Sequence, residues 1–232
     1  MIKVQPIFVT GVPRSGTSIV AAAINKCDVF IGEITKRSMY ENVKIHEEMV
    51  KPYLISLAVD PRGQYPLPDS SIISIPVNWK DRIEKIITDE GYKEGKWMYK
   101  GTSMGLMWQV WNYAFPNAKW IIVRRKPNDI IQSCLKTGYM NAYSDENIRS
   151  AVNVESEVEG WRYWIKQYEK RFVEMITEGV NCKIIWPERM VEGDYEQLHE
   201  VLNWLDLIWK SELLNFIDPL LWKSKNKERR TV

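Results

Sequence analysis

Residues 7–18 of this chain read IFVTGVPRSGTS, and this segment gives the strongest indication of the fold. Its first four residues are apolar or β-branched, which is typical of a buried strand, whereas residues 17–25 are rich in alanine and isoleucine and are predicted to form a helix. Glycine in the loop between them lets the backbone wrap closely around an anion, and the helix start offers free N–H groups and a partial positive charge. The segment therefore predicts a strand, an anion-binding loop and a helix.

The loop differs from the Walker A sequence G-x4-G-K-[ST] at a position that decides its ligand. Thr17 stands where that sequence has lysine, and the positive charge is supplied inside the loop by Arg14. We therefore expect Arg14, Ser15, Gly16, Thr17 and Ser18 to hold a phosphate-like group. Without the lysine that reaches the β- and γ-phosphates, the loop is poorly suited to ATP.

Short apolar runs alternate with helical patterns along the rest of the chain. This alternation predicts a parallel sheet with helices on both faces. We expect a single three-layer α/β domain over residues 1–232, with about five parallel strands. The strands are predicted at residues 7–10, 29–31, 97–99, 120–123 and 183–186. The helices are predicted at residues 17–25, 79–88, 104–114, 128–135, 154–177 and 195–205.

Residues 115–133 read FPNAKWIIVRRKPNDIIQS and form a second candidate anion site. Arg125 follows a predicted strand, and open α/β sheets bind ligands at the carboxyl ends of their strands. Ser133 is expected early in the next helix, near enough to share an anion with Arg125. Arginine can bind phosphate through two hydrogen bonds, and serine adds a neutral donor. The alternative is a surface ion-pair cluster of Arg124, Arg125 and Asp129.

Both segments resemble sequences of sulfotransferases that use 3′-phosphoadenosine 5′-phosphosulfate (PAPS). Residues 11–18 are similar to the loop that binds the 5′-phosphosulfate, most closely in the tyrosylprotein sulfotransferases and related bacterial enzymes, where arginine replaces lysine. Residues 115–133 are similar to the segment that binds the 3′-phosphate, and weaker similarities cover residues 96–102 and 182–205. The resemblance implies a P-loop NTPase-like fold, PAPS as the donor, adenosine 3′,5′-bisphosphate (PAP) as the product, and no metal.

The resemblance also implies roles for individual residues. Arg14 and Lys100 would stabilise the leaving phosphate, and a preorganised charge of this kind usually contributes most to catalysis. A base must take the proton of the acceptor, which is worth roughly 10²–10⁴-fold in rate. The tyrosylprotein enzymes use a glutamate after the first helix, so Glu33 is the candidate here and His46 the other possibility. Cofactor binding would fall to Arg14, Ser15, Gly16, Thr17, Ser18, Arg125 and Ser133.

Two other classes of function fit part of the sequence. A nucleotide or small-molecule kinase with a divergent phosphate loop would explain the fold, but it predicts the Walker lysine and a Mg²⁺-binding acid after a strand. It also leaves Arg125 and Ser133 unexplained. A non-catalytic relative that binds a nucleotide but lacks a base is the second alternative.

The acceptor is expected to be a small molecule, a sugar or a peptide with a hydroxyl group. Two loops, residues 60–78 and 138–150, are predicted to form the substrate or lid region, with Trp79, Tyr139 and Tyr143 near the acceptor pocket. The basic tail, residues 223–232, could close over the cofactor or remain solvated.

Composition limits the remaining possibilities. The net charge of +2 and pI of about 8.3 are too weak to favour nucleic acid as a partner. The three cysteines include no CxxC pair, which favours a reducing cytoplasm over a disulfide framework. We see no secretory signal at the N-terminus and no run long enough to cross a membrane, so a cytoplasmic location is expected.

Overall fold

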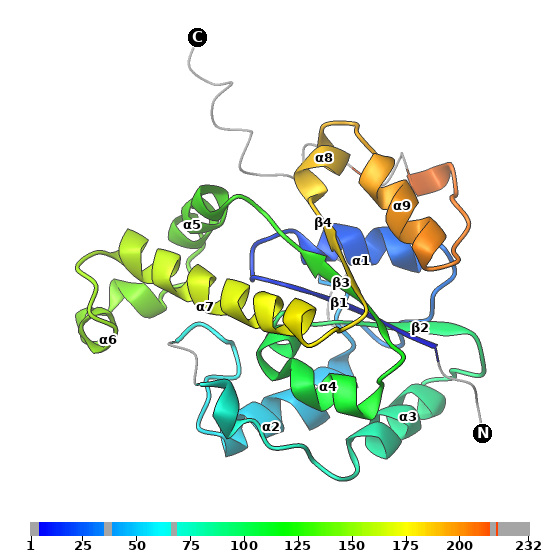
Figure 1. The fold of residues 1–232 in the computed structure, drawn as a ribbon, viewed down its shortest axis with the longest axis horizontal. Helices are drawn as coiled ribbons and strands as arrows, with labels where there is room; N and C mark the ends of the chain where they lie inside the picture. The colour runs from blue at the N-terminus through cyan, green and yellow to red at the C-terminus, as the bar shows by residue number, and fades with distance from the viewer. Residues whose placement is uncertain (1–4, 35–38, 66–68, 214–216, 218–232) are drawn as a thin grey trace.

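A parallel sheet lies at the centre of the molecule, with strand order β2-β1-β3-β4 (Figure 1). The structure is a computed structural model, and it describes residues 5–34, 39–65, 69–213 and 217. The strands are β1 (Gln5–Gly11), β2 (Lys96–Lys100), β3 (Lys119–Val123) and β4 (Cys182–Ile185). All three pairings are parallel, so the carboxyl ends of the strands meet at one edge of the sheet. The predicted parallel α/β architecture is confirmed.

The expected fifth strand, residues 29–31, is reduced to a single bridge beside β2. Phe30 makes two backbone hydrogen bonds with that strand. Its N–H donates to Lys96 O at 3.1 Å, and its carbonyl oxygen accepts from the Met98 N–H at 2.7 Å. The chain then leaves the sheet at Gly32, whose φ is +68°. The carbonyl of Ile31 accepts a hydrogen bond from the side chain of Asn42 instead. The prediction of five strands was therefore one too many within the described residues.

One face of the sheet is covered by the helix that follows the predicted anion-binding loop and by two helices from the last quarter of the described chain. Ile7 and Val9 of β1 point to this face, as expected from the two-residue period of a strand. They pack in a continuous apolar core with side chains of three helices. These helices lie on the same side of the sheet (Figure 1). These helices are α1 (Thr17–Asn25), α8 (Pro187–Val191) and α9 (Glu196–Trp204).

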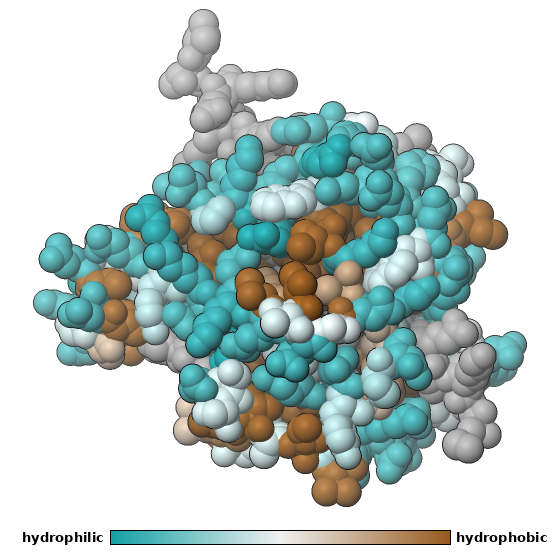
Figure 2. Space-filling view, in the orientation of Figure 1, coloured by the Kyte–Doolittle hydropathy of each residue, from teal (hydrophilic) through white to brown (hydrophobic). Residues whose placement is uncertain are grey.

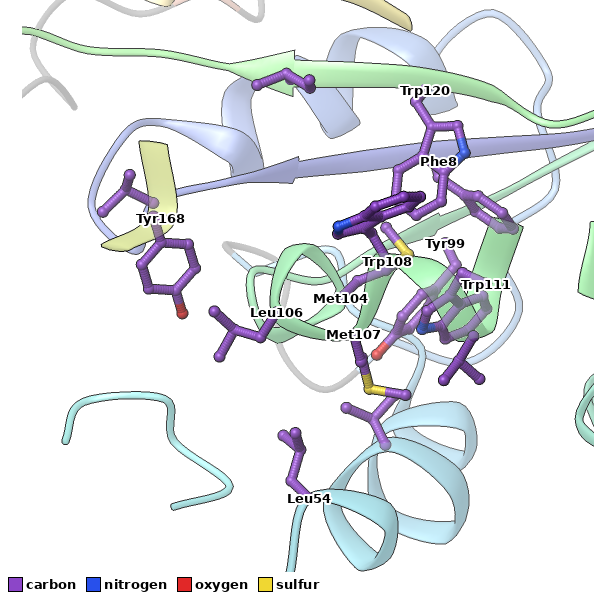
Figure 3. Packing of buried hydrophobic residues seen from close by; sticks show 14 of the residues in the cluster. Phe8, Leu54, Tyr99, Met104, Leu106, Met107, Trp108, Trp111, Trp120 and Tyr168 are labelled. Atoms are coloured by element: carbon purple, nitrogen blue, oxygen red, sulfur yellow. The ribbon is translucent and has the colours of Figure 1, made fainter. Parts of the chain in front are cut away.

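The opposite face is covered by a core rich in aromatic side chains. Phe8 points to this side and meets Trp111 and Trp120 edge to face, with ring centroids 5.1 and 4.9 Å apart (Figure 3). The helices of this layer are α2 (Lys51–Ser56), α3 (Trp79–Asp89), α4 (Trp108–Ala114) and α7 (Glu157–Thr177). Helices on both faces confirm the predicted three layers.

Several helical segments depart from the sequence prediction. Residues 104–114 were expected as one helix, but a 3-10 helix at Ser103–Met107 precedes α4 and brings Gly105 close to Phe172 of α7. A π-helical turn, Ile45–Val50, leads into α2 and was missed because its charged residues obscure the buried Ile45, Met49 and Val50. Two further helices are α5 (Pro127–Lys136), which was predicted, and α6 (Glu146–Ala151), which was not.

The surface of the face in view is mostly hydrophilic, with apolar side chains gathered at its centre around β4 (Figure 2). This strand is an edge of the sheet, and its Ile184 is 36% exposed. In the part of the chain that the structure describes, no helix combines the length and hydropathy needed to cross a membrane.

Candidate active site

The loop between β1 and α1, predicted to bind an anion, has an unusual backbone. Arg14 and Gly16 both adopt left-handed conformations, with φ of 75° and 94°. The Ser15 N–H donates to Val12 O at 2.9 Å and closes the turn. At Gly11 an added Cβ would lie 2.4 Å from the carbonyl oxygen of Val123, so only glycine lets the loop pass this close to β3.

Two features of this loop fit a bound phosphate group. The Ser15 hydroxyl is fully buried and has no hydrogen-bond partner among the described residues, which is costly unless a ligand supplies one. Gly16 caps α1 without a side-chain hydrogen bond, so the helix start keeps N–H groups available for an anion. Thr17 and Ser18 form the first turn of this helix, as predicted.

The side chain of Arg14 joins the loop to the second predicted anion segment. Its Nε donates to the Ser133 hydroxyl at 2.9 Å, and its Nη1 donates to the Tyr139 hydroxyl at the same distance. The Tyr139 ring centroid lies 5.9 Å from the guanidinium carbon. Ser133 and Tyr139, which are 119 and 125 positions after Arg14 in sequence, therefore share its guanidinium.

Arg125 belongs to the second predicted anion segment, and its side chain is hydrogen-bonded to the loop between β1 and α1. Its Nη1 donates to the carbonyl oxygen of Arg14 at 2.9 Å, and its Nε lies 3.8 Å from a carboxylate oxygen of Glu188. Burial lowers the pKa of Arg125, while Asp129 and Glu188 oppose that shift, and the guanidinium stays charged at neutral pH. Arg125 is only 7% exposed, so the predicted alternative of a surface ion-pair cluster is wrong for this residue.

Lys100 lies at the carboxyl end of β2 and is held by a residue that the sequence did not single out. Its Nζ lies 2.9 Å from Oε1 of Glu41, and both side chains are largely buried, with 5% and 15% exposed. The register pairs Lys100 with Val9 of β1, two residues before the loop begins. Lys100 and Glu41 therefore face the same edge of the sheet as the anion loop.

The segment that carries Glu41 is fixed on both sides. Ser18 donates from its hydroxyl to Met39 O at 3.3 Å, which ties the segment to the start of α1. The buried Asn42 donates to Glu90 Oε2 at 2.5 Å and accepts from the Ile45 N–H at 2.9 Å. This anchoring holds the Glu41 backbone between the anion loop and Lys100.

The structure also places Glu33 and His46, the two residues that the sequence predicted as candidate bases. Glu33 is exposed, and its described hydrogen bonds involve the backbone: its N–H donates to Glu90 Oε2, and its carbonyl accepts from Val43. His46 lies on the π-helical turn, with its Nε2 3.9 Å from Glu47. The structure gives no contact between either side chain and Arg14 or Lys100. Glu41 was missed because it lies in a charged stretch with no recognisable spacing.

The two predicted substrate loops, residues 60–78 and 138–150, are joined by hydrogen bonds of Gln64 from the first loop. Gln64 is 2% exposed, donates to Tyr139 O at 2.8 Å and accepts from the Asn141 N–H at 3.2 Å. Of the aromatic residues expected at the acceptor pocket, Tyr139 is 53% exposed, whereas Trp79 and Tyr143 are buried in the aromatic core. The basic tail, residues 223–232, lies outside the described residues.

Comparisons with known proteins identify the fold and the family of this chain. The fold is that of bacterial sulfotransferases: the structure matches STF9 of Mycobacterium avium with a TM-score of 0.53 at 13% identity, over 96% of this chain and 68% of that one. It matches a sulfotransferase of Alicyclobacillus acidocaldarius with a TM-score of 0.52 at 14% identity, over 90% and 88%. No curated protein matches the chain at a significant level. The family model described as "Sulfotransferase family" matches residues 6–211, and the chain belongs to that family.

Proposed function

We propose that this chain transfers a sulfuryl group from PAPS to a hydroxyl group of an acceptor. The observation that carries the proposal is the contact between the two anion segments, in which Arg125 donates to Arg14 O and Arg14 donates to Ser133. A single ligand with two separate anionic groups can contact both segments. PAPS has a 5′-phosphosulfate and a 3′-phosphate, whereas AMP and ATP lack the second group.

The donor is held by residues of both segments in this proposal. The N–H groups at the start of α1 and the hydroxyls of Ser15, Thr17 and Ser18 bind the 5′-phosphosulfate, and Arg125 and Ser133 bind the 3′-phosphate. PAPS supplies an activated sulfuryl group on a phosphate leaving group. Arg14 stabilises the negative charge that grows on that phosphate.

We assign the acceptor side to Lys100 and Glu41. Lys100 adds a second cation at the carboxyl edge of the sheet, and Glu41 accepts the proton of the acceptor hydroxyl. Glu41 replaces Glu33 in this role because its carboxylate is fixed against Lys100 at 2.9 Å, whereas Glu33 is exposed. A base is useful only when its position is held within hydrogen-bond reach of the reacting group.

Calorimetric titration with PAP, AMP and Mg·ATP tests the donor assignment. We expect PAP to bind without Mg²⁺ and at least about tenfold more tightly than AMP, since the 3′-phosphate adds charge-assisted hydrogen bonds. Arg125→Ala should abolish most of that preference. Tight binding of Mg·ATP with no preference for a 3′-phosphate would contradict the proposal and favour a kinase.

Arg124→Ala is the matched control for this titration. Arg124 is the neighbouring arginine, but its side chain pairs with Glu169, with Nη2 2.6 Å from Oε2, and its guanidinium lies over the ring of Trp186. The variant removes the same charge from the next position in the chain. We expect it to keep a clear preference for PAP over AMP, and equal losses in both variants would show that general charge, not the 3′-phosphate contact, sets the affinity.

A further inference from the structure

Tyr139 is an exposed residue that directly contacts Arg14, the cation of the predicted anion-binding loop. The residue is 53% exposed, yet its hydroxyl oxygen accepts a hydrogen bond from Arg14 Nη1 at 2.9 Å. The Nε of the same guanidinium is bound to Ser133. The phenol oxygen therefore lies at the residue that contacts both anion segments, and solvent can reach it.

The backbone that carries Tyr139 is held in place. Gln64 is buried and binds the chain on both sides of Met140, through the carbonyl of Tyr139 and the N–H of Asn141. Gln64 is itself held next to Gly63, whose carbonyl accepts a hydrogen bond from Trp164 Nε1 at 2.7 Å. Met140 is buried. The hydroxyl of Tyr139 thus has a defined position relative to Arg14, although its side chain is at the surface.

We propose that Tyr139 is a site of self-sulfation, at which the phenol oxygen takes the sulfuryl group from PAPS bound to the same molecule. This inference rests on the proposed function. A bond forms between Tyr139 Oη and sulfur, and the bond between sulfur and the 5′-phosphate oxygen breaks. The electron pair of the broken bond remains on PAP, and the phenol proton passes to water, which reaches the exposed hydroxyl.

Proximity is the physical reason that this residue would react. An attacking oxygen must lie roughly 3–3.5 Å from the atom that it attacks, and a held nucleophile gains a large effective concentration. Arg14 contacts Tyr139 and, in the proposed function, also the leaving phosphate. One guanidinium would therefore contact both the phenol oxygen and the leaving phosphate of the donor.

Sulfation of Tyr139 would weaken the binding of PAP at the donor site. A sulfate on Tyr139 is a permanent anion next to Arg14, and arginine binds such groups through short charge-assisted hydrogen bonds. It would compete with the 5′-phosphate of PAP for the same cation. Each molecule would react once, and the sulfated chain would bind PAP more weakly.

Incubation of the full chain with ³⁵S-labelled PAPS, without added acceptor, tests the inference. We expect the label to reach about one sulfuryl group per chain, on the peptide that contains Tyr139, at a rate independent of protein concentration, as an intramolecular reaction requires. Excess PAP should prevent labelling. The sulfated chain should bind PAP at least about tenfold more weakly, because the new anion occupies Arg14.

Tyr113 and Tyr139→Phe are the controls. Tyr113 on α4 is 69% exposed and serves as an equally accessible tyrosine with no described contact to Arg14, so it should stay unlabelled. Tyr139→Phe keeps the ring and should lose the label while its thermal unfolding stays unchanged. Two outcomes would overturn self-sulfation and leave the proposed function intact. One is equal labelling of Tyr113, and the other is a chain that binds PAP and consumes PAPS but stays unlabelled. A chain that does not bind PAP would overturn both.

Discussion

At the scale of single residues, the site depends on side chains whose partners lie far away in sequence. Glu41 and Lys100 are 59 positions apart and form a largely buried ion pair. Removing one partner of such a pair leaves an uncompensated charge, whereas a polar replacement can keep a hydrogen bond. Glutamine at position 41 therefore separates the chemistry of the carboxylate from its role in the fold.

Glu41→Gln should lower the rate at which PAPS is converted to PAP by roughly 10²–10⁴-fold, the usual worth of a general base. The amide oxygen can still accept a hydrogen bond from Lys100, so the affinity for PAP should be kept or increased. The rate is measured as PAP released, which transfer to any acceptor produces.

Glu33→Gln is the matched control for this experiment, because it makes the same change at the exposed glutamate that the sequence favoured. We expect it to leave the rate within about threefold of the unmodified chain, as is usual for surface substitutions away from special features. The opposite ranking, with Glu33→Gln inactive and Glu41→Gln active, would return the role of base to Glu33.

At the scale of elements, α7 connects the sheet and its core to the two predicted substrate loops. This helix of 21 residues begins with a capping box, in which the Ser156 hydroxyl accepts from the Glu159 N–H and the Glu159 carboxylate accepts from the Ser156 N–H. Its Trp164 holds Gly63, next to Gln64. The start of α7 therefore contributes to stability, and its middle positions the loop that contacts Tyr139.

Ser156→Ala should lower the free energy of unfolding by about 1 kcal/mol, because alanine cannot accept the hydrogen bond of the cap. Urea unfolding curves measure the change. Ser150→Ala is the control, since Ser150 lies at an exposed position of α6 with no described side-chain hydrogen bond. Equal stability of Ser156→Ala and the unmodified chain would contradict the assigned role of the cap.

At the scale of the whole molecule, several titratable side chains are buried in the core. Cys134 follows Ser133 on α5, is fully buried, and burial raises its pKa from 9.0 to about 12. Burial also raises the pKa of Tyr99, Tyr143 and Tyr168. Each of these groups holds its proton more tightly in the folded chain than in the unfolded chain.

Stability should therefore fall at alkaline pH. Below pH 9.0 Cys134 is protonated in both states, and as the pH rises toward about 12 only the unfolded state loses the proton. A shift of this size corresponds to a loss of up to about 4 kcal/mol from the free energy of unfolding. Urea unfolding measured below and above pH 9.0 shows the loss. Cys134→Ala should show a smaller loss, and an identical pH dependence would contradict this assignment.

The sequence by itself determined the local parts of this protein. The loop at residues 11–16, the strand before it and the helix after it are formed by neighbouring residues, so their glycines and apolar pattern suffice to predict them. The same holds for the strand before Arg125 and for the position of Ser133 in α5. A fifth strand was wrongly predicted because Gly32 and Asn42, acting together, turn the chain out of the sheet after Phe30.

The tertiary structure alone decided which distant side chains meet. Glu41 and Gln64 lie in segments without a motif, and their importance follows from burial against Lys100 and against the loop of Tyr139. The hydrogen bond between Arg14 and Ser133 joins two parts of the candidate site that are 119 positions apart in sequence. Local patterns cannot specify such contacts, because they depend on how parallel strands align their carboxyl ends and on which loops the helices bring to that edge.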